Sequence, residues 1–437
     1  MTDALTGGVC EVDALNHDGA GVGRCAGKVV FIEGALPGEE VDFGYRGRKP
    51  RYDRAVMHAL RRASPDRVTP PCAHFGVCGG CRLQHLASSA QRTAKAEIVR
   101  ATLSHVGGVA PEHWAEPLAG AVWGYRRKAR LGVRVVPKKG GVLVGFRERA
   151  HSFITPLTVC HTLMPALGER LADLTALIAE LSCPERIPQI EFAAGDDTAA
   201  LVFRHLVPLT EADRGRLEAF GAAYGFTVYT QAAGPDTLVR LGPEGAPLCY
   251  HLPAFALAMR FAPTDFVQVH AEVNREMVAQ AVEWLAPGPA ERILDLFSGI
   301  GNFALPLARS ADCVLGVEGV AALTERARAN AAANGLANTD WETRDLVAGD
   351  LAGLARDFHA DAALLDPPRT GALEVVTALA EAEVARVCYV SCNPATLARD
   401  SAILVHRYGY RLARAGVVDM FPHTHHIETM CLFTREP

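Results

Sequence analysis

Short runs of alternating apolar and polar residues, separated by Gly and Pro, characterise the first part of the chain. This alternation is typical of β-strands that bury one face. The runs occupy residues 8–15, 27–33, 40–43 and 54–60. Roughly five short strands joined by such turns predict a small β-barrel of the OB type, an architecture that often binds single-stranded nucleic acid. We therefore predict a barrel over residues 1–62.

The pattern changes to helical spacing at residues 88–106, where an amphipathic stretch ends at Gly107-Gly108. Alternating strands then predominate from residue 124 to about residue 248, interrupted by a helical stretch at residues 165–181. This succession predicts an antiparallel sheet with one or two helices. We predict a central α+β domain over residues 63–255, whose helix 88–106 is a candidate to pack on the following domain.

From residue 267 onward, helical stretches alternate with short, almost continuously apolar strands. The strands are expected at residues 293–297, 314–317, 362–365, 387–390 and 430–433. This alternation predicts a doubly wound α/β domain with helices on both faces of its sheet. We assign this Rossmann-like domain to residues 256–437. The chain contains no internal repeat, no low-complexity tract and no apolar run of the ~18–20 residues that would span a bilayer.

Charge and composition narrow the class of protein. The net charge of −5 argues against a wholly basic nucleic-acid-binding protein, but basic residues are concentrated in two segments. Residues 45–67 contain eight Lys and Arg against two acidic residues, and residues 121–150 contain nine against one. Aromatic residues lie within both segments, which suits contacts with nucleic-acid phosphates and bases. A solvated surface would have the same composition.

The N-terminus lacks the basic and apolar regions of a secretory signal, so we expect the protein in the reducing cytoplasm. Clustered cysteines in that compartment suit metal binding better than disulfides. Cys72, Cys78 and Cys81 form a C-x5-C-x2-C group with two glycines inside its tight loop. Cys160 is the best candidate for a fourth ligand. From this spacing alone, zinc and a [4Fe–4S] cluster are equally supported.

A glycine-rich turn follows the first strand of the predicted Rossmann-like domain, in the sequence Asp295-Leu-Phe-Ser-Gly-Ile-Gly-Asn-Phe303. Such a turn lets a ligand approach the backbone and the N–H groups at the start of the next helix. Glu318 ends the second strand and is suited to accept hydrogen bonds from two ribose hydroxyls. The pair indicates a nucleoside-bearing cofactor, and the turn resembles the S-adenosylmethionine (SAM) turn of class I methyltransferases. The alternative is a plain tight turn.

Three further candidate groups lie at the ends of later strands. Cys392 is close to a helix N-terminus, which is expected to lower its thiol pKa and make it a nucleophile, although most single cysteines are small buried residues. Asp366-Pro-Pro-Arg369 places a carboxylate beyond a buried strand, as in amino-methyltransferases, or forms a plain turn. Glu428 precedes the last strand, where a lone Glu is usually a surface residue. Three histidines beside it lack a recognised metal-ligand spacing, so we predict a polar loop there.

Together these segments resemble the RNA uracil-5-methyltransferase family over nearly the whole chain. The motifs that carry the resemblance are Phe266-x-Gln268, Asp295–Phe303, Asp366–Arg369, Ser391–Pro394 and Asp419–Glu428. Residues 18–23 and 35–40 resemble the TRAM domain, an RNA-binding module of tRNA- and rRNA-modifying enzymes. With the cysteine group included, the chain is most similar to 23S rRNA (uracil-5)-methyltransferases of RumA type.

The resemblance implies a class I SAM-methyltransferase fold and a covalent mechanism. C5 of uracil is a weak nucleophile, so a thiolate adds at C6, C5 takes the methyl group of SAM, and a base removes the C5 proton. The family's nucleophile falls on Cys392 and its general base on Glu428. Its SAM contacts fall on Gln268, Phe297, Asn302, Glu318, Asp345 and Asp366. Its [4Fe–4S] ligands fall on Cys72, Cys78, Cys81 and Cys160, which favours iron–sulfur over zinc.

Two positions depart from the family pattern. Asp345 stands where Asn is usual, so it can accept a hydrogen bond from an adenine amino group but cannot donate one. His270 also stands where Asn is expected.

The resemblance implies RNA as the partner, with 23S rRNA favoured and the tRNA T-loop as the alternative. Because a duplex hides C5 in the base stack, we expect the target uridine to be flipped out or presented in a loop. We further expect a monomer without membrane contact. Two other functions keep some support: a class I methyltransferase acting on an exocyclic amine through Asp366-Pro-Pro, and a non-catalytic iron–sulfur RNA-binding protein.

Overall fold

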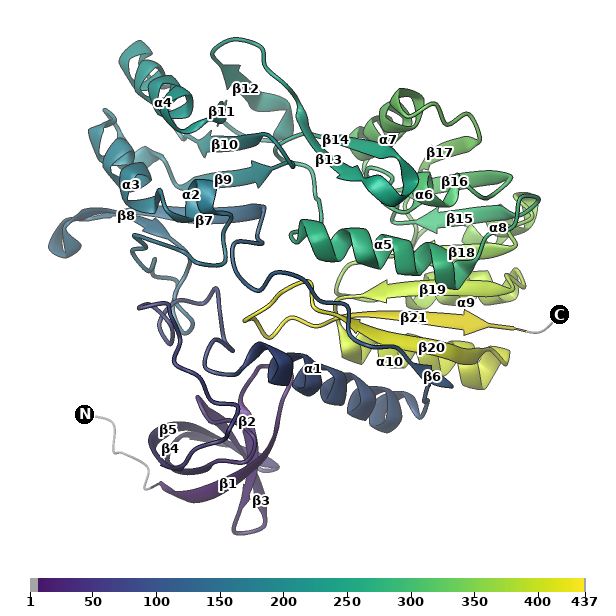
Figure 1. Cartoon of the computed structure of the whole chain (residues 1–437), viewed down its shortest axis with the longest axis horizontal. Helices are drawn as coiled ribbons and strands as arrows, with labels where there is room; N and C mark the ends of the chain where they lie inside the picture. Colours follow the sequence, from purple (N-terminus) through teal and green to yellow (C-terminus); the bar gives the residue numbers. More distant parts are fainter. Residues whose placement is uncertain (1–6, 436–437) are drawn as a thin grey trace.

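The computed structural model describes residues 7–435, apart from the side chain of Lys139. The outermost residues of the predicted first and third domains, 1–6 and 436–437, therefore lie outside the described residues. Within that range the strands form a closed barrel, a six-stranded sheet, a two-stranded hairpin and an eight-stranded sheet (Figure 1). This combination of an N-terminal barrel, a central α+β part and a large C-terminal α/β part confirms the predicted fold class.

The N-terminal barrel contains the first five strands of the chain. They are β1 (Gly8–Leu15), β2 (Gly21–Cys25), β3 (Lys28–Glu33), β4 (Glu40–Arg48) and β5 (Tyr52–Arg62). Their order is β1-β2-β3-β5-β4, and pairing of β4 with β1 closes the barrel. Alternate residues fill the interior, such as Val30 and Ile32 on β3, which are both fully buried. Closure leaves no unpaired strand edge, which protects the backbone of so small a barrel.

The central sheet has the order β12-β11-β10-β9-β7-β8. Its strands are β7 (Lys128–Val136), β8 (Gly141–Gly145), β9 (Gln189–Ala194), β10 (Ala199–Arg204), β11 (Phe226–Gln231) and β12 (Leu238–Leu241). Its helices are α2 (Pro165–Gly168), α3 (Leu171–Glu180) and α4 (Glu211–Tyr224).

The prediction of an antiparallel central sheet is wrong for one pair of strands. Strands β10 and β11 run parallel, because α4 connects them as a crossover helix. The sequence pattern missed α4 because its buried face carries only two large apolar side chains, Leu217 and Phe220. The local feature that does mark this helix is a capping box at its N-terminus, formed by Thr210 and Asp213.

The C-terminal sheet has the order β17-β16-β15-β18-β19-β21-β20-β6. Its strands are β6 (His113–Trp114), β15 (Arg292–Leu296), β16 (Cys313–Glu318), β17 (Thr339–Thr343), β18 (Ala362–Leu365), β19 (Arg386–Ser391), β20 (Arg411–Val418) and β21 (Glu428–Thr434). The first five in spatial order are parallel, whereas β21 runs antiparallel to both of its neighbours. The sequence pattern did not show the short edge strands β6 and β17, nor β20.

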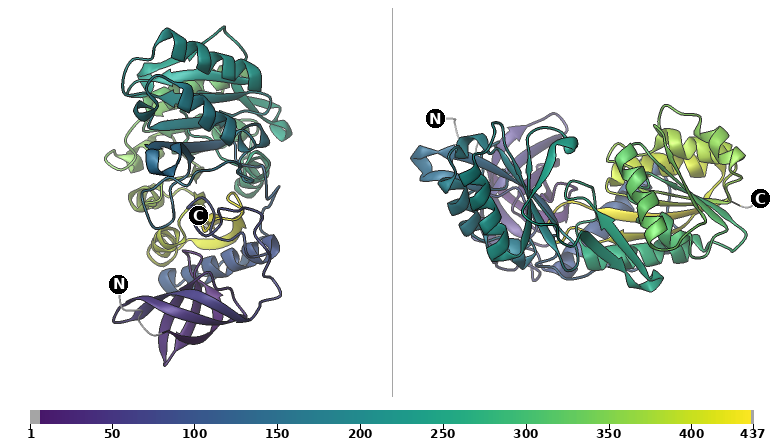
Figure 2. Two further views of the ribbon diagram at one scale, coloured as in Figure 1. Left: turned by 90° about the vertical axis from the view of Figure 1, so that its left-hand side faces the viewer. Right: turned by 90° about the horizontal axis from the view of Figure 1, so that it is seen from above.

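Helices cover both faces of this sheet (Figures 1 and 2). They are α1 (Ser88–Thr102), α5 (Ala271–Leu285), α6 (Ala304–Leu307), α7 (Ala321–Ala333), α8 (Leu351–Asp357), α9 (Leu373–Glu381) and α10 (Pro394–Ala402). Successive strand residues alternate between two cores: Ile293 packs with α5 and α7, while Leu294 packs with α1, α9 and α10. A sheet buried on both faces explains why its strands appear as continuous apolar runs in the sequence.

A hairpin joins the central part to the C-terminal sheet. It consists of β13 (Leu248–Leu252) and β14 (Leu257–Phe261), and the predicted domain boundary at residues 255/256 falls in the turn between them. Both strands pack into the same core as α5 and the sheet. The hairpin therefore belongs with the C-terminal sheet by its packing.

Helix α1 lies between the barrel and the C-terminal sheet (Figure 1). Four residues spaced four apart form its buried stripe: Gln91, Lys95, Val99 and, in the π-helical turn that continues it (Leu103–Gly107), Leu103. Its neighbouring face packs Ala90, Ala94 and Ile98 against a small apolar cluster that includes Leu15 and Leu36 of the barrel region.

The two polar members of the α1 stripe hold a distant loop. Lys95 Nζ donates to Asp419 Oδ1 at 2.7 Å and to the Phe421 carbonyl at 3.0 Å, and both charged side chains are 2% exposed. Gln91 accepts from the His423 N–H at 2.8 Å. Helix α1 thereby fixes the loop of residues 419–427, which leads directly into β21.

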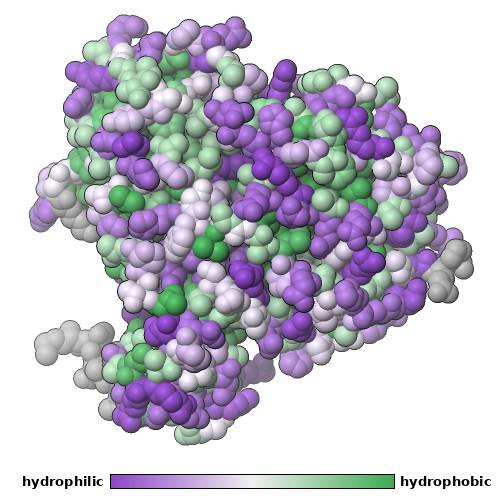
Figure 3. Space-filling model, in the orientation of Figure 1, coloured by the Kyte–Doolittle hydropathy of each residue, from purple (hydrophilic) through white to green (hydrophobic). Residues whose placement is uncertain are grey.

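On the face of the molecule that Figure 3 shows, hydrophilic residues are spread over the barrel, the central part and the C-terminal part. Among the described residues, no helix is both long enough and apolar enough to cross a membrane.

We expect Lys95→Met to lower the free energy of unfolding by about 3–5 kcal/mol, because it leaves Asp419 as a buried carboxylate without its cation. Arg92→Met is the control: it lies on the same helix with a partly exposed side chain, and its effect should stay within about 0.5 kcal/mol. Chemical denaturation followed by circular dichroism measures both variants. Equal stability of the two variants would show that the buried ion pair is dispensable.

Candidate active site

The predicted site residues of the C-terminal part line the carboxyl edge of its parallel strands. Their order along this edge follows the strand order β17-β16-β15-β18-β19 and is Asp345, Glu318, Phe297, Asp366, Cys392. The direction of strand succession reverses between β15 and β18. In an open α/β sheet, ligands bind in the crevice at this reversal point. Phe297 and Asp366 stand on either side of it.

The turn after β15 has an unusual backbone conformation. Phe297, Gly299 and Gly301 all have positive φ values, of 63°, 55° and 90°. A Cβ on Gly301 would lie 2.4 Å from Leu305 Cδ1, whereas a Cβ on Gly299 would meet open space. The turn is therefore packed tightly from behind and accessible in front, at the crevice.

Glu318 is fixed beside this turn. Its Oε2 accepts from the Gly299 N–H at 3.0 Å, and its Oε1 accepts from the Val320 N–H at 3.0 Å. Each carboxylate oxygen can accept further hydrogen bonds. The carboxylate is thus oriented by the protein and retains acceptor capacity for a ligand.

The other predicted cofactor contacts belong to two hydrogen-bonded groups. Gln268 Nε2 donates to Asp366 Oδ2 at 3.1 Å. Asn302 exchanges hydrogen bonds with Asn274 of α5 at 3.0 and 3.1 Å and accepts from the Tyr250 hydroxyl at 2.8 Å. Sequence reasoning missed Asn274 and Tyr250, because each is a single polar residue within an otherwise ordinary helix or strand pattern.

Asp345 stands apart from these groups. Its Oδ1 accepts from the N–H groups of Val347 and Ala348 at 2.9 and 3.2 Å in an exposed turn. These two hydrogen bonds lower the pKa of its carboxyl. The structure places Asp345 at the carboxyl edge of the parallel strands but does not bring it into contact with the other predicted cofactor-binding residues. His270, the second departure, caps the start of α5 by accepting from the Val273 N–H.

Cys392 and Glu428 come together because β19 and β21 are antiparallel. Ser391, the last residue of β19, pairs with Thr429, the second residue of β21. Cys392 follows Ser391 and Glu428 precedes Thr429, so the two stand at matching positions across the strands. Glu428 is 4% exposed, whereas Cys392 is partly exposed. Arg369, which follows β18, interacts electrostatically with both Cys392 and Glu428.

Burial and mutual repulsion raise the pKa values of the acidic groups at this point. Burial raises the pKa of Asp366 to about 7, against a smaller lowering by Gln268. Burial and the nearby Asp366 carboxylate raise the pKa of Glu428 well above its ordinary value, with Arg369 opposing them. Burial, Glu428 and Asp366 raise the pKa of Cys392 to about 11. The predicted lowering of the Cys392 thiol pKa is therefore wrong, because burial and two carboxylates outweigh the helix N-terminus.

Named relatives are similar to this sequence over almost its whole length. A family model described as tRNA (Uracil-5-)-methyltransferase matches residues 254–436, and a TRAM domain model matches residues 10–42. A Nitrosococcus oceani protein named 23S rRNA (uracil(1939)-C(5))-methyltransferase RlmD is 52% identical over 97% of this chain and 95% of the relative. An Alkalilimnicola ehrlichii protein of the same name is 50% identical over 97% of this chain and 96% of the relative. The chain belongs to the RNA uracil-5-methyltransferase family.

The fold of this uracil-5-methyltransferase agrees with a solved structure. The Pyrococcus abyssi tRNA (uracil-54, C5)-methyltransferase, solved in complex with S-adenosyl-L-homocysteine, superposes with a TM-score of 0.72. The match covers 98% of this chain and 100% of the other at 24% sequence identity. The family membership and the fold predicted from the motifs are thus both confirmed.

The four predicted metal-ligand cysteines of this uracil-5-methyltransferase surround one small cavity. Cys72, Cys78, Cys81 and Cys160 line it together with apolar side chains that include Phe75, Phe146 and Leu157. Burial raises the pKa of the Cys81 thiol to about 12 and also raises that of Cys78. Among the described residues, however, no three His, Cys, Asp or Glu side chains are grouped so as to hold a metal ion. The structure therefore brings the cysteines together without showing the predicted metal site.

The histidines before Glu428 form part of the protein packing. Burial lowers the pKa of His423 and His425 to about 4 and that of His426 to about 3, so all three are neutral at pH 7. His423 stacks on Trp123 with ring centroids 3.7 Å apart. These contacts agree with the prediction of a polar loop.

We expect the Asp366 carboxyl to make stability fall as pH rises from about 4 to about 7. The native protein keeps the Asp366 proton up to about pH 7, whereas the unfolded chain loses it near pH 4. Across this interval the free energy of unfolding of the wild type should fall relative to Asp366→Asn by on the order of 3–4 kcal/mol. Urea denaturation of both proteins without SAM, repeated across this pH range, measures the difference.

Asp345→Asn is the matched control, because hydrogen bonds lower the pKa of its exposed carboxyl. Between pH 4 and pH 7 the stability difference between the wild type and this variant should stay nearly flat, because the stability that a lowered pKa provides is fully present above the unfolded-state pKa of about 4. A flat difference between wild type and Asp366→Asn would show that Asp366 ionises normally in the native protein.

Proposed function

We propose that this protein methylates C5 of a specific uridine in 23S rRNA, with SAM as the methyl donor. The observation that carries the proposal is the pairing of Cys392 with Glu428 at the ends of β19 and β21, beside the crevice of the sheet. A nucleophile and a base side by side are what the uracil-5 reaction requires. The names of relatives at 52% and 50% identity over nearly the whole chain support 23S rRNA as the substrate.

Cys392 and Glu428 divide the reaction between them. The Cys392 sulfur, after losing its proton to solvent, forms a bond to C6 of the uracil. C5 then carries the displaced electron pair and takes the methyl group, which leaves the sulfur of SAM. Glu428 removes the C5 proton, and the electrons of that C–H bond restore the C5–C6 double bond as the Cys392–C6 bond breaks. The thiolate is regenerated and no other reactant is consumed.

The raised pKa values suit these roles. Burial and Asp366 favour the protonated form of Glu428 in the unloaded protein; once ionised, a carboxylate of raised pKa is a stronger base than an ordinary glutamate and is better matched to a carbon-bound proton. The Cys392 thiol stays protonated in the unloaded protein because it is buried and because Glu428 and Asp366 lie near it. Arg369 opposes this effect, and the positive sulfonium of SAM would add to Arg369 when bound. We infer that the nucleophile becomes active mainly in the loaded enzyme.

The proposed SAM contacts follow the crevice. Glu318 keeps acceptor capacity for ribose hydroxyls, and Phe297 lies half-buried in the turn beside it. Gln268, Asn302 and Asp366 contribute polar groups around the reversal point, and Asp345 is the outermost candidate contact. For the whole chain we propose that residues 1–62 and 63–255 bind the RNA, while residues 256–437 carry the reaction.

We also propose that Cys72, Cys78, Cys81 and Cys160 hold a [4Fe–4S] cluster. Their convergence on one cavity supports it, and so does the burial of the Cys78 and Cys81 thiols, since a buried thiolate needs a cation to offset its charge. Methyl transfer needs no electron, so the cluster's role is structural.

We expect RNA with 5-fluorouridine at the target position to trap a covalent complex in the presence of SAM. Fluorine at C5 cannot be removed as a proton, so the Cys392–C6 bond persists and survives denaturing gel electrophoresis. A 23S rRNA fragment and a tRNA T-arm are tested in parallel, and the 23S rRNA fragment should form the complex.

Cys392→Ala should abolish the trapped complex, whereas Cys313→Ala, a partly exposed cysteine at the start of β16, should retain it. Glu428→Gln should accumulate a methylated covalent complex even with ordinary uridine, because the C5 proton is not removed. A trapped complex on the T-arm alone would reassign the substrate to tRNA. A wild type that does not bind SAM, or that binds SAM but forms a trapped complex with neither RNA, would contradict the uracil-5 mechanism.

We expect protein purified without oxygen to contain about four iron and four sulfide per chain, and Cys81→Ser to lose most of both. Cys183→Ser is the control, because Cys183 is partly buried but does not line the cysteine cavity, and it should retain the full content. Metal analysis and acid-labile sulfide determination measure these amounts. One zinc per chain, without sulfide, would replace the cluster by a zinc site.

A further inference from the structure

Arg127 has the largest side chain among the fully buried residues that the structure describes, and it lies just before β7 of the central sheet. Only 2% of this side chain is exposed, so its guanidinium is a buried cation. Its Nη1 lies 3.7 Å from Asp196 Oδ1 and has no hydrogen-bond partner among the described residues. Burial lowers the pKa of the guanidinium, because taking a cation out of water is unfavourable. An ion pair of this length offsets little of that cost, so the role of Arg127 has to be sought in its other contacts.

One of these contacts fixes the backbone at Gln268. Arg127 Nε donates to the Gln268 carbonyl at 2.9 Å, and the Arg127 N–H donates to the Val269 carbonyl at 3.0 Å. Gln268 lies between β14 and α5 in a segment without regular secondary structure, so individual hydrogen bonds determine its backbone position. Its side chain donates to Asp366 Oδ2 at 3.1 Å. Arg127 therefore sets the place from which Gln268 reaches Asp366.

A second contact reaches the Asn302 group through Tyr250. The Arg127 guanidinium lies over the Tyr250 ring, with its Cζ 4.6 Å from the ring centroid. A cation in this position is attracted to the face of the aromatic ring, most strongly where water is excluded. The Tyr250 hydroxyl donates to Asn302 Oδ1 at 2.8 Å. Arg127 thus contacts one member of each of the two hydrogen-bonded groups that contain proposed SAM contacts.

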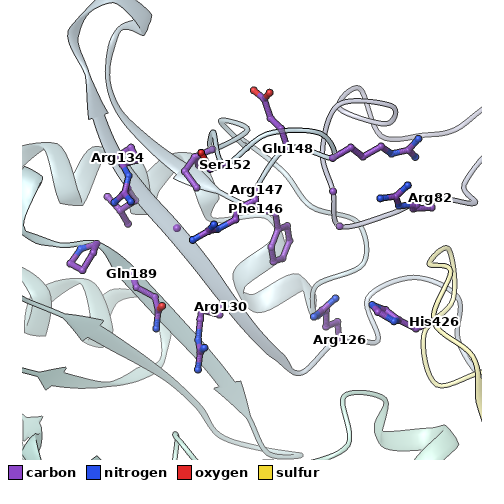
Figure 4. Close-up of a pocket in the computed structure, with 17 residues that line it drawn as sticks. Arg82, Arg126, Arg130, Arg134, Phe146, Arg147, Glu148, Ser152, Gln189 and His426 are labelled. Carbon is purple, nitrogen blue, oxygen red and sulfur yellow. The ribbon is translucent and has the colours of Figure 1, made fainter. Parts of the chain in front are cut away.

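The backbone of Arg127 belongs to the central sheet. Its carbonyl accepts from the Ala194 N–H of β9 at 2.9 Å. The preceding residue, Arg126, lines a cavity beside the central sheet together with other arginines, as Figure 4 shows. The side chain of Arg127 turns instead to Gln268 and Tyr250. Arg127 therefore connects the central sheet with the crevice of the C-terminal sheet.

We propose that Arg127 is a positioning residue for SAM, which acts on the cofactor through Gln268 and, by way of Tyr250, through Asn302. The inference rests on the proposed function, since it takes SAM as the cofactor and Gln268 and Asn302 as its contacts. The guanidinium holds a carbonyl and a ring in place before SAM arrives, so these polar groups need less ordering when SAM binds. Packing of the central sheet against the C-terminal part is thereby a condition for tight SAM binding.

The test begins with Arg127→Met, which keeps a buried side chain of similar length and removes both the Nε donor and the charge. Asp196 retains hydrogen bonds from Arg275 and from the His251 N–H, each at 2.8 Å, so its carboxylate is not left unpaired. The Kd for SAM, measured by isothermal titration calorimetry without RNA, should rise by on the order of tenfold, the effect of losing one hydrogen bond from a charged donor. The Kd for the 23S rRNA fragment should stay within about twofold of the wild-type value.

Kinetics distinguish positioning from a general loss of structure. KM for SAM should rise in parallel with Kd, whereas kcat at saturating SAM should stay within about threefold, because the lost interactions are equal in the ground and transition states. Tyr250→Phe removes only the hydroxyl that donates to Asn302 and should weaken SAM binding by roughly threefold. In the double variant the two effects should combine to less than their product, because Arg127 acts partly through Tyr250.

Arg386→Met is the matched control, because Arg386 makes the same two kinds of contact at the opposite edge of the sheet. Its Nε donates to the Leu285 carbonyl at 3.0 Å, and its Nη2 pairs with Glu291 at 2.6 Å. Arg386 is the first residue of β19, whereas Cys392 follows the last residue of that strand. This variant should lose stability in chemical denaturation but bind SAM as tightly as the wild type.

The outcomes separate this inference from the proposed function. An unchanged Kd for SAM in Arg127→Met would overturn the inference, and so would equal weakening in Arg127→Met and Arg386→Met, which would reflect general destabilisation. Loss of RNA affinity with unchanged SAM affinity would also overturn it. Tyr250→Phe keeps the test decisive if Arg127→Met folds incompletely, because normal SAM binding by Tyr250→Phe would remove the link to Asn302. A wild type that does not bind SAM would be a failure of the proposed function itself.

Discussion

The antiparallel placement of β21 between β19 and β20 is the constraint on which the candidate active site depends. In a wholly parallel sheet, the start of the last strand would lie at the opposite edge from Cys392. Because β21 runs the other way, its first residue, Glu428, stands beside the residue that follows β19. Asp366 and Arg369 enter from the neighbouring strand β18. A single reversal of strand direction thus adds Glu428 to the point where the parallel strands β18 and β19 already bring a thiol, a carboxyl group and a guanidinium.

Burial gives this cluster its chemical character. Three groups that become negative on ionisation share a partly desolvated place, so each ionisation makes the next less favourable. The positive charge of Arg369 opposes the rise in the pKa of both Cys392 and Glu428. The cluster consequently suits a ligand that brings positive charge, and its acids and its nucleophile are best understood as one coupled system rather than as separate residues.

Helix α1 links the parts of the molecule that must act together on a large substrate. It packs on the barrel region with one face and on the C-terminal sheet with another. Through Gln91 and Lys95 it also holds the loop that ends at Glu428. The position of the candidate base is therefore tied to the barrel, and through His426 the same loop lines a cavity beside the central sheet.

Local patterns in the sequence were sufficient for the barrel, for the buried strands of the C-terminal sheet and for the residues at their ends. These features depend on alternation, on turn residues and on motifs of a few neighbouring positions. The tertiary structure alone decided the parallel pairing of β10 with β11, the contacts of Asn302 with Tyr250 and Asn274, and the clustering of arginines. It also reversed the expected shift of the Cys392 pKa. That pKa depends on burial and on carboxylates that lie far away in the sequence and approach the thiol only when the strands pair.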